Sequence, residues 1–305
     1  MQDLHEISLK SLEVYAKILV DGFLTGKHKS PYHGFSVEFA EHKIYNKGQS
    51  TKHIDWKLYA RTNKLFVKRF EEETNLRCQI VIDASSSMRY PLKKKYSFNQ
   101  PNKLLFSILA SASLMKLFVK QRDAVGLSLF SEGVDYHSAS KTTLKHLISL
   151  KKVMLEDFNK TENAKKTFSV KSLHQIASQL NKRSLVMIFT DMLDTENSLD
   201  EIFLALQHLK FNKHEVILFH LMDYKSELNF DFDNVPHKFI DIETNESIEV
   251  NPLTIKDSYK VKSAKFMKKI KLLCHKNKID LVKIDINNDL ESVLSSYLLK
   301  RKKIY

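Results

Sequence analysis

Short apolar runs alternate with longer segments of helical character from residue 77 onward. The apolar runs cover residues 78–83, 124–130, 185–189, 215–222 and 280–284. The helical segments cover residues 103–120, 142–155, 170–180, 199–209, 251–277 and 289–299. Strands that read as unbroken apolar runs are typical of a parallel sheet buried on both faces by the helices between them. The pattern predicts an α/β fold with a doubly wound, mainly parallel sheet flanked by helices.

The first 75 residues have a different character. Residues 6–26 carry apolar side chains at helical spacing, and residues 65–67 form a short strand-like run. No linker rich in Pro, Gly or Ser separates this part from the rest of the chain. We expect an N-terminal helical and β extension over residues 1–75, packed on an α/β domain with a C-terminal elaboration over residues 76–305.

Composition narrows the class of protein. The chain has 305 residues, of which 43% are hydrophobic, so it can bury a substantial core. Its two cysteines, Cys78 and Cys274, are too few for a disulfide framework or a cysteine zinc cluster, and they fit a reducing compartment. The most apolar stretch, residues 104–119, is too short and too interrupted to cross a bilayer, and no signal peptide is visible. We expect a cytoplasmic protein whose membrane contact is at most peripheral.

The chain carries an excess of positive charge. It has 49 Lys and Arg against 36 Asp and Glu, which gives a formal charge of +13. Most of the excess is lysine, whereas base reading and bidentate phosphate recognition favour arginine. A basic nucleic-acid-binding protein is therefore an alternative, but we expect no specific nucleic acid partner. The charge would instead speed the encounter with an acidic protein surface.

Oxygen-bearing side chains follow two of the predicted strands and precede one helix. The carboxyl ends of parallel strands meet at one edge of a sheet, where doubly wound folds bind ligands. Carboxylate and hydroxyl oxygens are the ligands that Mg²⁺ or Mn²⁺ prefers. The expected metal ligands are Asp83, Ser85, Ser87, Thr167 and Asp191. Thr161, in the same loop as Thr167, is an alternative for the threonine ligand.

Two other interpretations of the Asp-x-Ser-x-Ser segment at residues 83–87 are open. Ser and Asp are common caps and turn formers, so the Asp-x-Ser-x-Ser segment could only terminate a strand. Asp83 could also be the nucleophile of a metal-dependent phosphoryl-transfer hydrolase. Such enzymes carry a second acid two residues later, where this chain has Ser85, and the G-x-S-x-G pattern of serine hydrolases is absent. We therefore expect a protein that is not an enzyme.

The combination of motifs resembles known families. Asp-x-Ser-x-Ser after a strand, a threonine in a later loop and Thr190-Asp191 after a further strand are similar to the metal-ion-dependent adhesion site of von Willebrand factor A domains, whose fold is Rossmann-like. The pattern I-D-W-K-x-x-A-R-T at residues 54–62, which runs into the segment 65–73, resembles the signature of the bacterial family called domain of unknown function 58.

The resemblance implies a non-enzymatic, divalent-metal-dependent protein interaction module. In von Willebrand factor A domains the serines and the threonine contact the metal directly or through water, the acids act mainly through water, and a partner's Asp or Glu completes the shell. Members of the bacterial family are typically encoded beside MoxR-type AAA+ ATPases, which suggests an adaptor role for such an ATPase. Trp56 and Arg61 are candidates for a second partner-binding surface, although Trp56 could instead pack the extension on the core.

Overall fold

The computed structural model describes residues 7–25, 39–45, 54–70, 76–160, 167, 169–194 and 199–294. These residues belong to two compact units. The smaller unit contains the described residues between 30 and 75, and the larger unit contains all the others.

The larger unit is built on a six-stranded sheet. Its strands in chain order are β3 (Arg77–Asp83), β4 (Ala124–Phe130), β5 (Val134–Lys141), β6 (Leu185–Thr190), β7 (Glu215–Met222) and β10 (Asp280–Asp285). Across the sheet they follow the order β5-β4-β3-β6-β7-β10. Neighbouring strands are parallel except β4 and β5, which are antiparallel. The doubly wound, mainly parallel fold predicted from the sequence is therefore confirmed.

The strand order creates a topological switch point between β3 and β6. From β3 the chain continues outward through β4 to β5, whereas β6 starts the other half of the sheet, with β7 and β10. Because β3 and β6 pair in parallel with Ile82 opposite Phe189, their carboxyl ends lie side by side. Ligand sites of open α/β sheets lie in the crevice at such a point.

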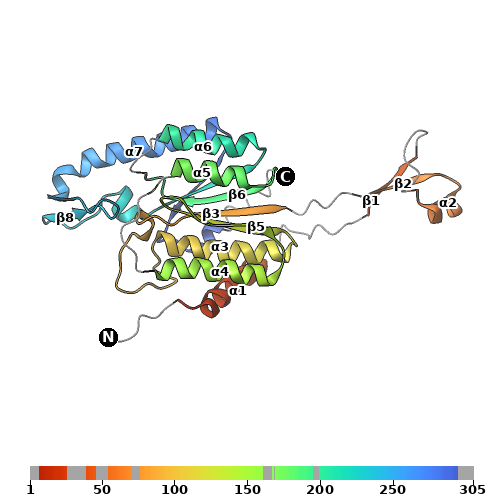
Figure 1. Cartoon of the computed structure of the whole chain (residues 1–305), viewed down its shortest axis with the longest axis horizontal. Coiled ribbons are helices and arrows are strands. Elements are labelled where there is room, and N and C mark those ends of the chain that lie inside the picture. The colour runs from red at the N-terminus through yellow and green to blue at the C-terminus, as the bar shows by residue number, and fades with distance from the viewer. Residues whose placement is uncertain are drawn as a thin grey trace. The chain divides into compact units, whose positions relative to one another are not determined.

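Helices cover both faces of this sheet (Figure 1). One face carries α1 (Leu9–Thr25), α3 (Lys103–Lys120) and α4 (Leu144–Asn159), and the other carries α5 (Ser169–Gln179), α6 (Leu199–Phe211) and α7 (Pro252–Lys276). Helix α3 is buried along most of its length, and most of its buried residues are apolar or small. Asn102 caps its first turn by accepting a hydrogen bond from the Leu105 amide at 2.8 Å. This cap begins the helix at Lys103, next to the carboxyl edge of the sheet.

Helix α1 packs on α3 within the larger unit, although the sequence analysis grouped it with the extension over residues 1–75. Its buried face consists of Leu12, Ala16, Leu19 and Val20, which recur at helical spacing. An ion pair between Lys120 of α3 and Asp21 of α1, with 2.8 Å between Nζ and Oδ1, is exposed and adds little stability. The apolar face therefore holds α1, and the separate unit begins only after this helix.

Tight packing near the strands leaves no room for a side chain at one position of β4. A Cβ added at Gly126 would collide with the Gln79 side chain of β3 and with the main-chain carbonyl of Ser138 in β5. On the other half of the sheet, Phe189 and Phe219 stack on neighbouring strands with ring centroids 4.5 Å apart. These contacts fix the register of the central strands and hence the positions of the loops that leave them.

The smaller unit pairs β1 (Phe39–Ile44) antiparallel with β2 (Phe66–Phe70), and α2 (Trp56–Thr62) lies between them in sequence. Asp55 caps α2, because its Oδ1 accepts hydrogen bonds from the amides of Lys57 and Leu58 at 3.1 Å. The side chain of Trp56 is 61% exposed and makes an edge contact with Tyr59. Arg61 is also exposed.

Three short elements complete the carboxyl edge of the larger unit. They are η2 (Ser87–Arg89), the π-helical turn η3 (Tyr224–Leu228) and an antiparallel hairpin of β8 (His237–Ile240) and β9 (Ser247–Val250). Among the described residues, no helix is long and apolar enough to span a bilayer.

Candidate functional site

The loop after β3 gathers one carboxylate and two hydroxyls. Asp83 Oδ1 accepts a hydrogen bond from the Ser85 amide at 3.0 Å, which turns the chain sharply after the strand. The hydroxyl oxygens of Ser85 and Ser87 lie 3.0 Å apart. The side chain of Met88 is fully buried and anchors η2 below them. The Asp-x-Ser-x-Ser segment therefore presents its three oxygen-bearing side chains together.

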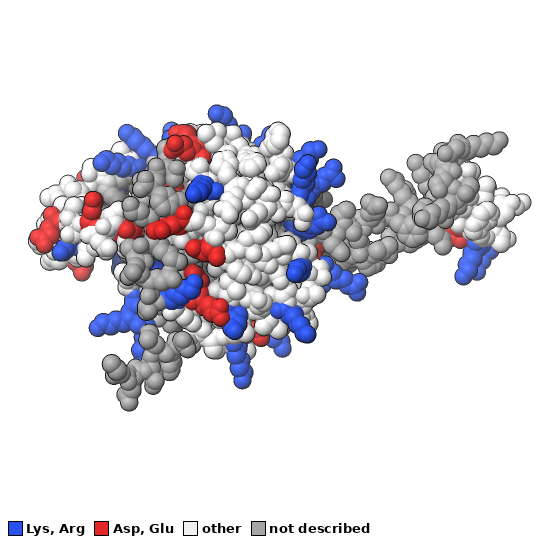
Figure 2. Space-filling model, viewed as in Figure 1, with Lys and Arg blue, Asp and Glu red and all other residues white. Residues whose placement is uncertain are grey.

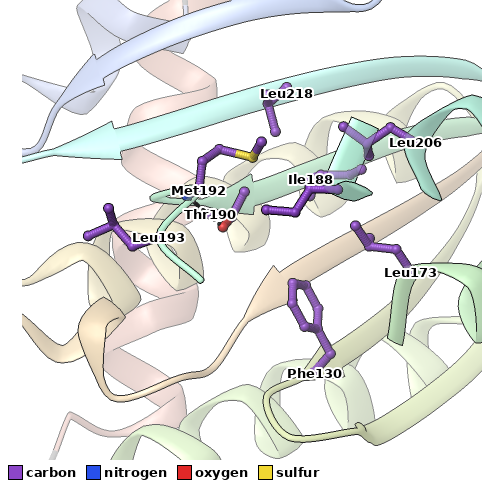
Figure 3. Close-up of a pocket in the computed structure, with 9 residues that line it drawn as sticks. Phe130, Leu173, Ile188, Thr190, Met192, Leu193, Leu206 and Leu218 are labelled. Atoms are coloured by element: carbon purple, nitrogen blue, oxygen red, sulfur yellow. Dashed lines mark hydrogen bonds between the residues drawn. The ribbon is translucent and has the colours of Figure 1, made fainter. Parts of the chain in front are cut away.

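The end of β6 adjoins this loop directly. The Thr190 hydroxyl donates a hydrogen bond to Asp83 Oδ2 at 2.8 Å and accepts one from the Met192 amide at 3.0 Å. Figure 3 shows the apolar side chains that surround the space beneath Thr190, among them Phe130 and Ile188. Both oxygens of Asp83 thus accept hydrogen bonds, and the residues around the space beside Thr190 are mostly apolar.

Asp191 is paired with a buried lysine that the sequence analysis missed. The Nζ of Lys103 lies 2.7 Å from Asp191 Oδ2 and 2.7 Å from Glu227 Oε1. Lys103 has no solvent exposure, and Glu227 belongs to η3. Burial alone would lower the pKa of Lys103, but the two carboxylates raise it above its ordinary value. The ammonium group is therefore charged and ties α3, the β6 loop and η3 together.

Thr167 contacts an acid from the hairpin that the sequence analysis also missed. The Thr167 hydroxyl donates to Glu243 Oε1 at 2.8 Å, and the Thr167 amide donates to Glu243 Oε2 at 3.3 Å. Ser87 also acts on Glu243, because it lowers the pKa of that carboxyl group. Glu243 thereby ties the hairpin to the segment that carries Thr167. Thr161, the alternative threonine ligand, lies outside the described residues.

Burial and mutual repulsion perturb the acids of this site. Burial, followed by the negative charge of Asp191, raises the pKa of Asp83 to about 7, although hydrogen bonds from Ser85 and Thr190 act in the opposite direction. Burial also raises the pKa of Glu243, against the lowering effect of its hydrogen bonds from Thr167 and Ser87. Burial is the main cause of both shifts, and the negative charge of Asp191 adds to each of them.

The structure brings three of the five predicted ligands, Asp83, Ser85 and Ser87, together in one loop. Thr167 binds Glu243, which lines the same cavity as Ser87. Asp191 acts on Asp83 electrostatically, while Lys103 holds one of the Asp191 oxygens. Trp56 and Arg61 belong to the smaller unit.

The donor set suits a hard cation. All the side chains concerned offer oxygen atoms, which Mg²⁺ and Mn²⁺ prefer. In the described part of the chain, no three His, Cys, Asp or Glu residues are grouped so that they could hold a metal ion. A cation here would therefore depend on the hydroxyls of Ser85, Ser87 and Thr167 in addition to carboxylates. Acidic side chains also gather on the half of the larger unit that carries β8, whereas Lys and Arg spread along its outline (Figure 2).

An open cavity of about 470 Å³ adjoins these oxygens. Ser87, Lys103, Glu227 and Glu243 contribute its polar wall. Its apolar wall is aromatic and consists of Tyr90, Phe230, Phe232, Phe239 and Tyr259, with Leu193, Ile240 and Ile242. The site is therefore accessible from one side, next to the β8–β9 hairpin.

Comparisons with known proteins give uncharacterized relatives and solved structures of low similarity. The uncharacterized proteins Rv1480 of Mycobacterium tuberculosis (strain ATCC 25618 / H37Rv) and Mb1516 of Mycobacterium bovis are each 30% identical over 83 residues, or 27% of this chain. The chain spans about a quarter (26%) of the length of these curated relatives.

Two solved structures align with 75% of the chain. BatB from Bacteroides thetaiotaomicron is 15% identical, with 99% of that chain covered and a TM-score of 0.42. An aerotolerance-related membrane protein from Bacteroides fragilis is 12% identical, with 100% of that chain covered and a TM-score of 0.45.

The family described as "Protein of unknown function DUF58" matches residues 41–268, which is most of the chain. The chain belongs to this family.

Proposed function

We propose that the larger unit is a divalent-metal-dependent protein interaction module. Asp83, Ser85, Ser87, Thr167 and Asp191 would hold Mg²⁺ or Mn²⁺, and the bound cation would attract an Asp or Glu of a partner protein. The resemblance found in the sequence suggested this role, and the charges around these residues support it.

The observation that carries the proposal is an excess of acid, most of it buried, at the switch point of the sheet. Among the described residues that interact here, four carboxyl groups (Asp83, Asp191, Glu227 and Glu243) stand against the single ammonium of Lys103. Burying carboxylates without a compensating charge is costly. A divalent cation among the hydroxyls would offset this cost and favour the ionised acids.

Several contacts support a binding role over hydrolysis. Asp83 is fully buried, and both of its oxygens already accept hydrogen bonds, so it is poorly placed to attack a phosphorus atom. The hydroxyls of Ser85 and Ser87 contact each other, and this contact does not include a histidine base. His220, the histidine that contacts the Asp191 carbonyl, is kept neutral because burial lowers its pKa to about 4.

We further propose that the partner is a MoxR-type AAA+ ATPase, as the family resemblance suggests. The test is capture of such an ATPase from the same genome by the immobilised full chain in Mg²⁺. EDTA and the double variant Ser85→Ala/Ser87→Ala should both reduce capture. The matched control is Ser178→Ala/Ser258→Ala, whose serines lie exposed on α5 and α7 and should leave capture unchanged. Capture that is indifferent to EDTA and to Ser85→Ala/Ser87→Ala would refute a metal-dependent interface.

The hydrolase alternative has its own check. We expect no phosphatase or esterase turnover with Mg²⁺ present, because in the described part of the chain no activated nucleophile is positioned beside the proposed ligands. A screen with generic chromogenic substrates measures this directly. Turnover that Asp83→Asn abolishes would replace the interaction module with a phosphoryl-transfer enzyme.

A further inference from the structure

Glu243 is a buried acid at the tip of an exposed hairpin. Glu243 is only 7% exposed. In contrast, all of residues 244–249, in the turn and in β9, are exposed. Apolar burial therefore does not hold this part of the hairpin against the site. The hydrogen bonds from the amide and the hydroxyl of Thr167 are the contacts that hold the carboxylate there.

The turn that carries Glu243 is pre-organised. Asp241 Oδ1 accepts hydrogen bonds from the amides of Glu243 and Thr244 at 2.7 and 3.2 Å. The Asn245 amide donates to the Asp241 carbonyl at 2.9 Å, and Asn245 adopts a left-handed backbone with φ of 61°. Glu243 is thus presented to the site by a rigid turn.

Aromatic contacts anchor the base of the hairpin on the same side. The ring of Phe239 in β8 lies 5.5 Å from that of Phe230 and 5.1 Å from that of Phe232, between centroids. Phe230 in turn packs on Tyr259 of α7, with centroids 4.4 Å apart. The aromatic contacts therefore fix the hairpin to the larger unit at β8.

We propose that Glu243 is the chain's own carboxylate ligand of this site and closes it against the acidic side chain of a partner. The inference rests on the proposed function, because it assigns Glu243 to the place that the partner's Asp or Glu would take. The reason is steric and electrostatic: Glu243 accepts the hydrogen bond of the Thr167 hydroxyl and lines the same cavity as Ser87, so a second carboxylate cannot make the same contacts. The partner must displace Glu243, which lowers the partner's apparent affinity by the fraction of time the site is open.

The test compares Glu243→Gln with Glu249→Gln. The first variant removes the charge at the site and keeps the size of the side chain. The second removes a charge from an exposed position of β9 in the same hairpin. Mg²⁺ binding is measured first by calorimetry. Binding of the capped peptide Gly-Gly-Asp-Gly-Gly, with its Asn counterpart as control, is then measured by NMR titration in saturating Mg²⁺.

If Glu243 closes the site about nine-tenths of the time, Glu243→Gln should bind the Asp peptide about tenfold more tightly than the wild type. Glu249→Gln should bind it like the wild type, and no protein should gain affinity for the Asn peptide. Circular dichroism should show the same fold in all three proteins.

The remaining outcomes overturn the inference in distinguishable ways. Equal peptide binding by the wild type and Glu243→Gln, with Mg²⁺ bound by both, would leave the proposed function standing and remove Glu243 as a competitor. A loss of Mg²⁺ binding in Glu243→Gln with no gain in peptide affinity would make Glu243 a permanent ligand. Absence of Mg²⁺ binding in every protein, wild type included, would overturn the proposed function together with this inference.

Discussion

Replacement of Lys103 by methionine tests whether the buried ion cluster holds the carboxyl edge together. The substitution keeps an unbranched side chain that is one atom shorter, and it removes the ammonium that contacts Asp191 and Glu227 at 2.7 Å each. The side chains of Lys103 and Asp191 are both only 1% exposed, so water cannot replace the lost contacts. Removing one partner of a buried pair costs about 3–5 kcal/mol, because an uncompensated charge stays behind. The expected fall in Tm for a unit of this size is about 6–20 °C.

The assay is urea unfolding followed by far-UV circular dichroism. Tryptophan fluorescence would not serve, because Trp56 is the sole tryptophan and belongs to the smaller unit. Lys120→Met is the matched control on the same helix, since its ion pair with Asp21 is about two-fifths exposed and worth at most about 1 kcal/mol. Adding Glu227→Gln to Lys103→Met should recover part of the loss, because it removes one of the two orphaned carboxylates. A Lys103→Met variant no less stable than Lys120→Met would refute the reasoning.

Two further predictions concern the larger unit. Gly126→Ala should lower the free energy of unfolding by about 1–3 kcal/mol, because the added Cβ collides with Gln79 and with the main chain of Ser138. The same urea assay checks this. Unchanged stability would mean that the central strands are less tightly packed than described. Cys78 and Cys274 should both resist a thiol reagent at pH 8 until the protein unfolds, because both are buried and burial raises the pKa of Cys274 to about 12. Rapid labelling of either cysteine in the folded protein would contradict the buried positions.

The parts of the site that follow from strand ends could be predicted from the sequence. Asp83 and Asp191 each come directly after an apolar run, and parallel pairing of those runs brings their ends together whatever the details of the loops. The same reasoning predicts the sheet itself, because unbroken apolar runs have few alternatives to burial on both faces.

The groups that modify the site could not be predicted in this way. Lys103 looks like an ordinary residue in the first turn of a helix, and Glu243 looks like an ordinary acid in a hairpin turn. Their roles depend on contacts with Asp191, 88 residues away, and with Thr167, 76 residues away, which no local pattern encodes. A usable signal was that Asn102 begins an almost wholly apolar helix at Lys103, which forces that lysine into the protein.

The assignment of α1 to the extension failed for a related reason. The spacing of its apolar residues predicts a helix with one buried face, but it does not say which part of the chain covers that face. In the structure, α3 covers the apolar face of α1, although the smaller unit lies between the two helices in sequence.

The most direct test of the account is a count of bound Mn²⁺ by the loss of the free-ion electron paramagnetic resonance signal. The account predicts one Mn²⁺ per chain in the wild type, displaced by Mg²⁺. It also predicts that Ser85→Ala/Ser87→Ala binds Mn²⁺ with an affinity at least about tenfold lower, because two hydroxyl ligands are lost. A tenfold loss of affinity corresponds to about 1.4 kcal/mol, which is a modest cost for two contacts. The control Ser178→Ala/Ser258→Ala should bind like the wild type. Absence of binding in the wild type, or equal binding in the Ser85→Ala/Ser87→Ala variant, would contradict a metal site at the switch point of the sheet.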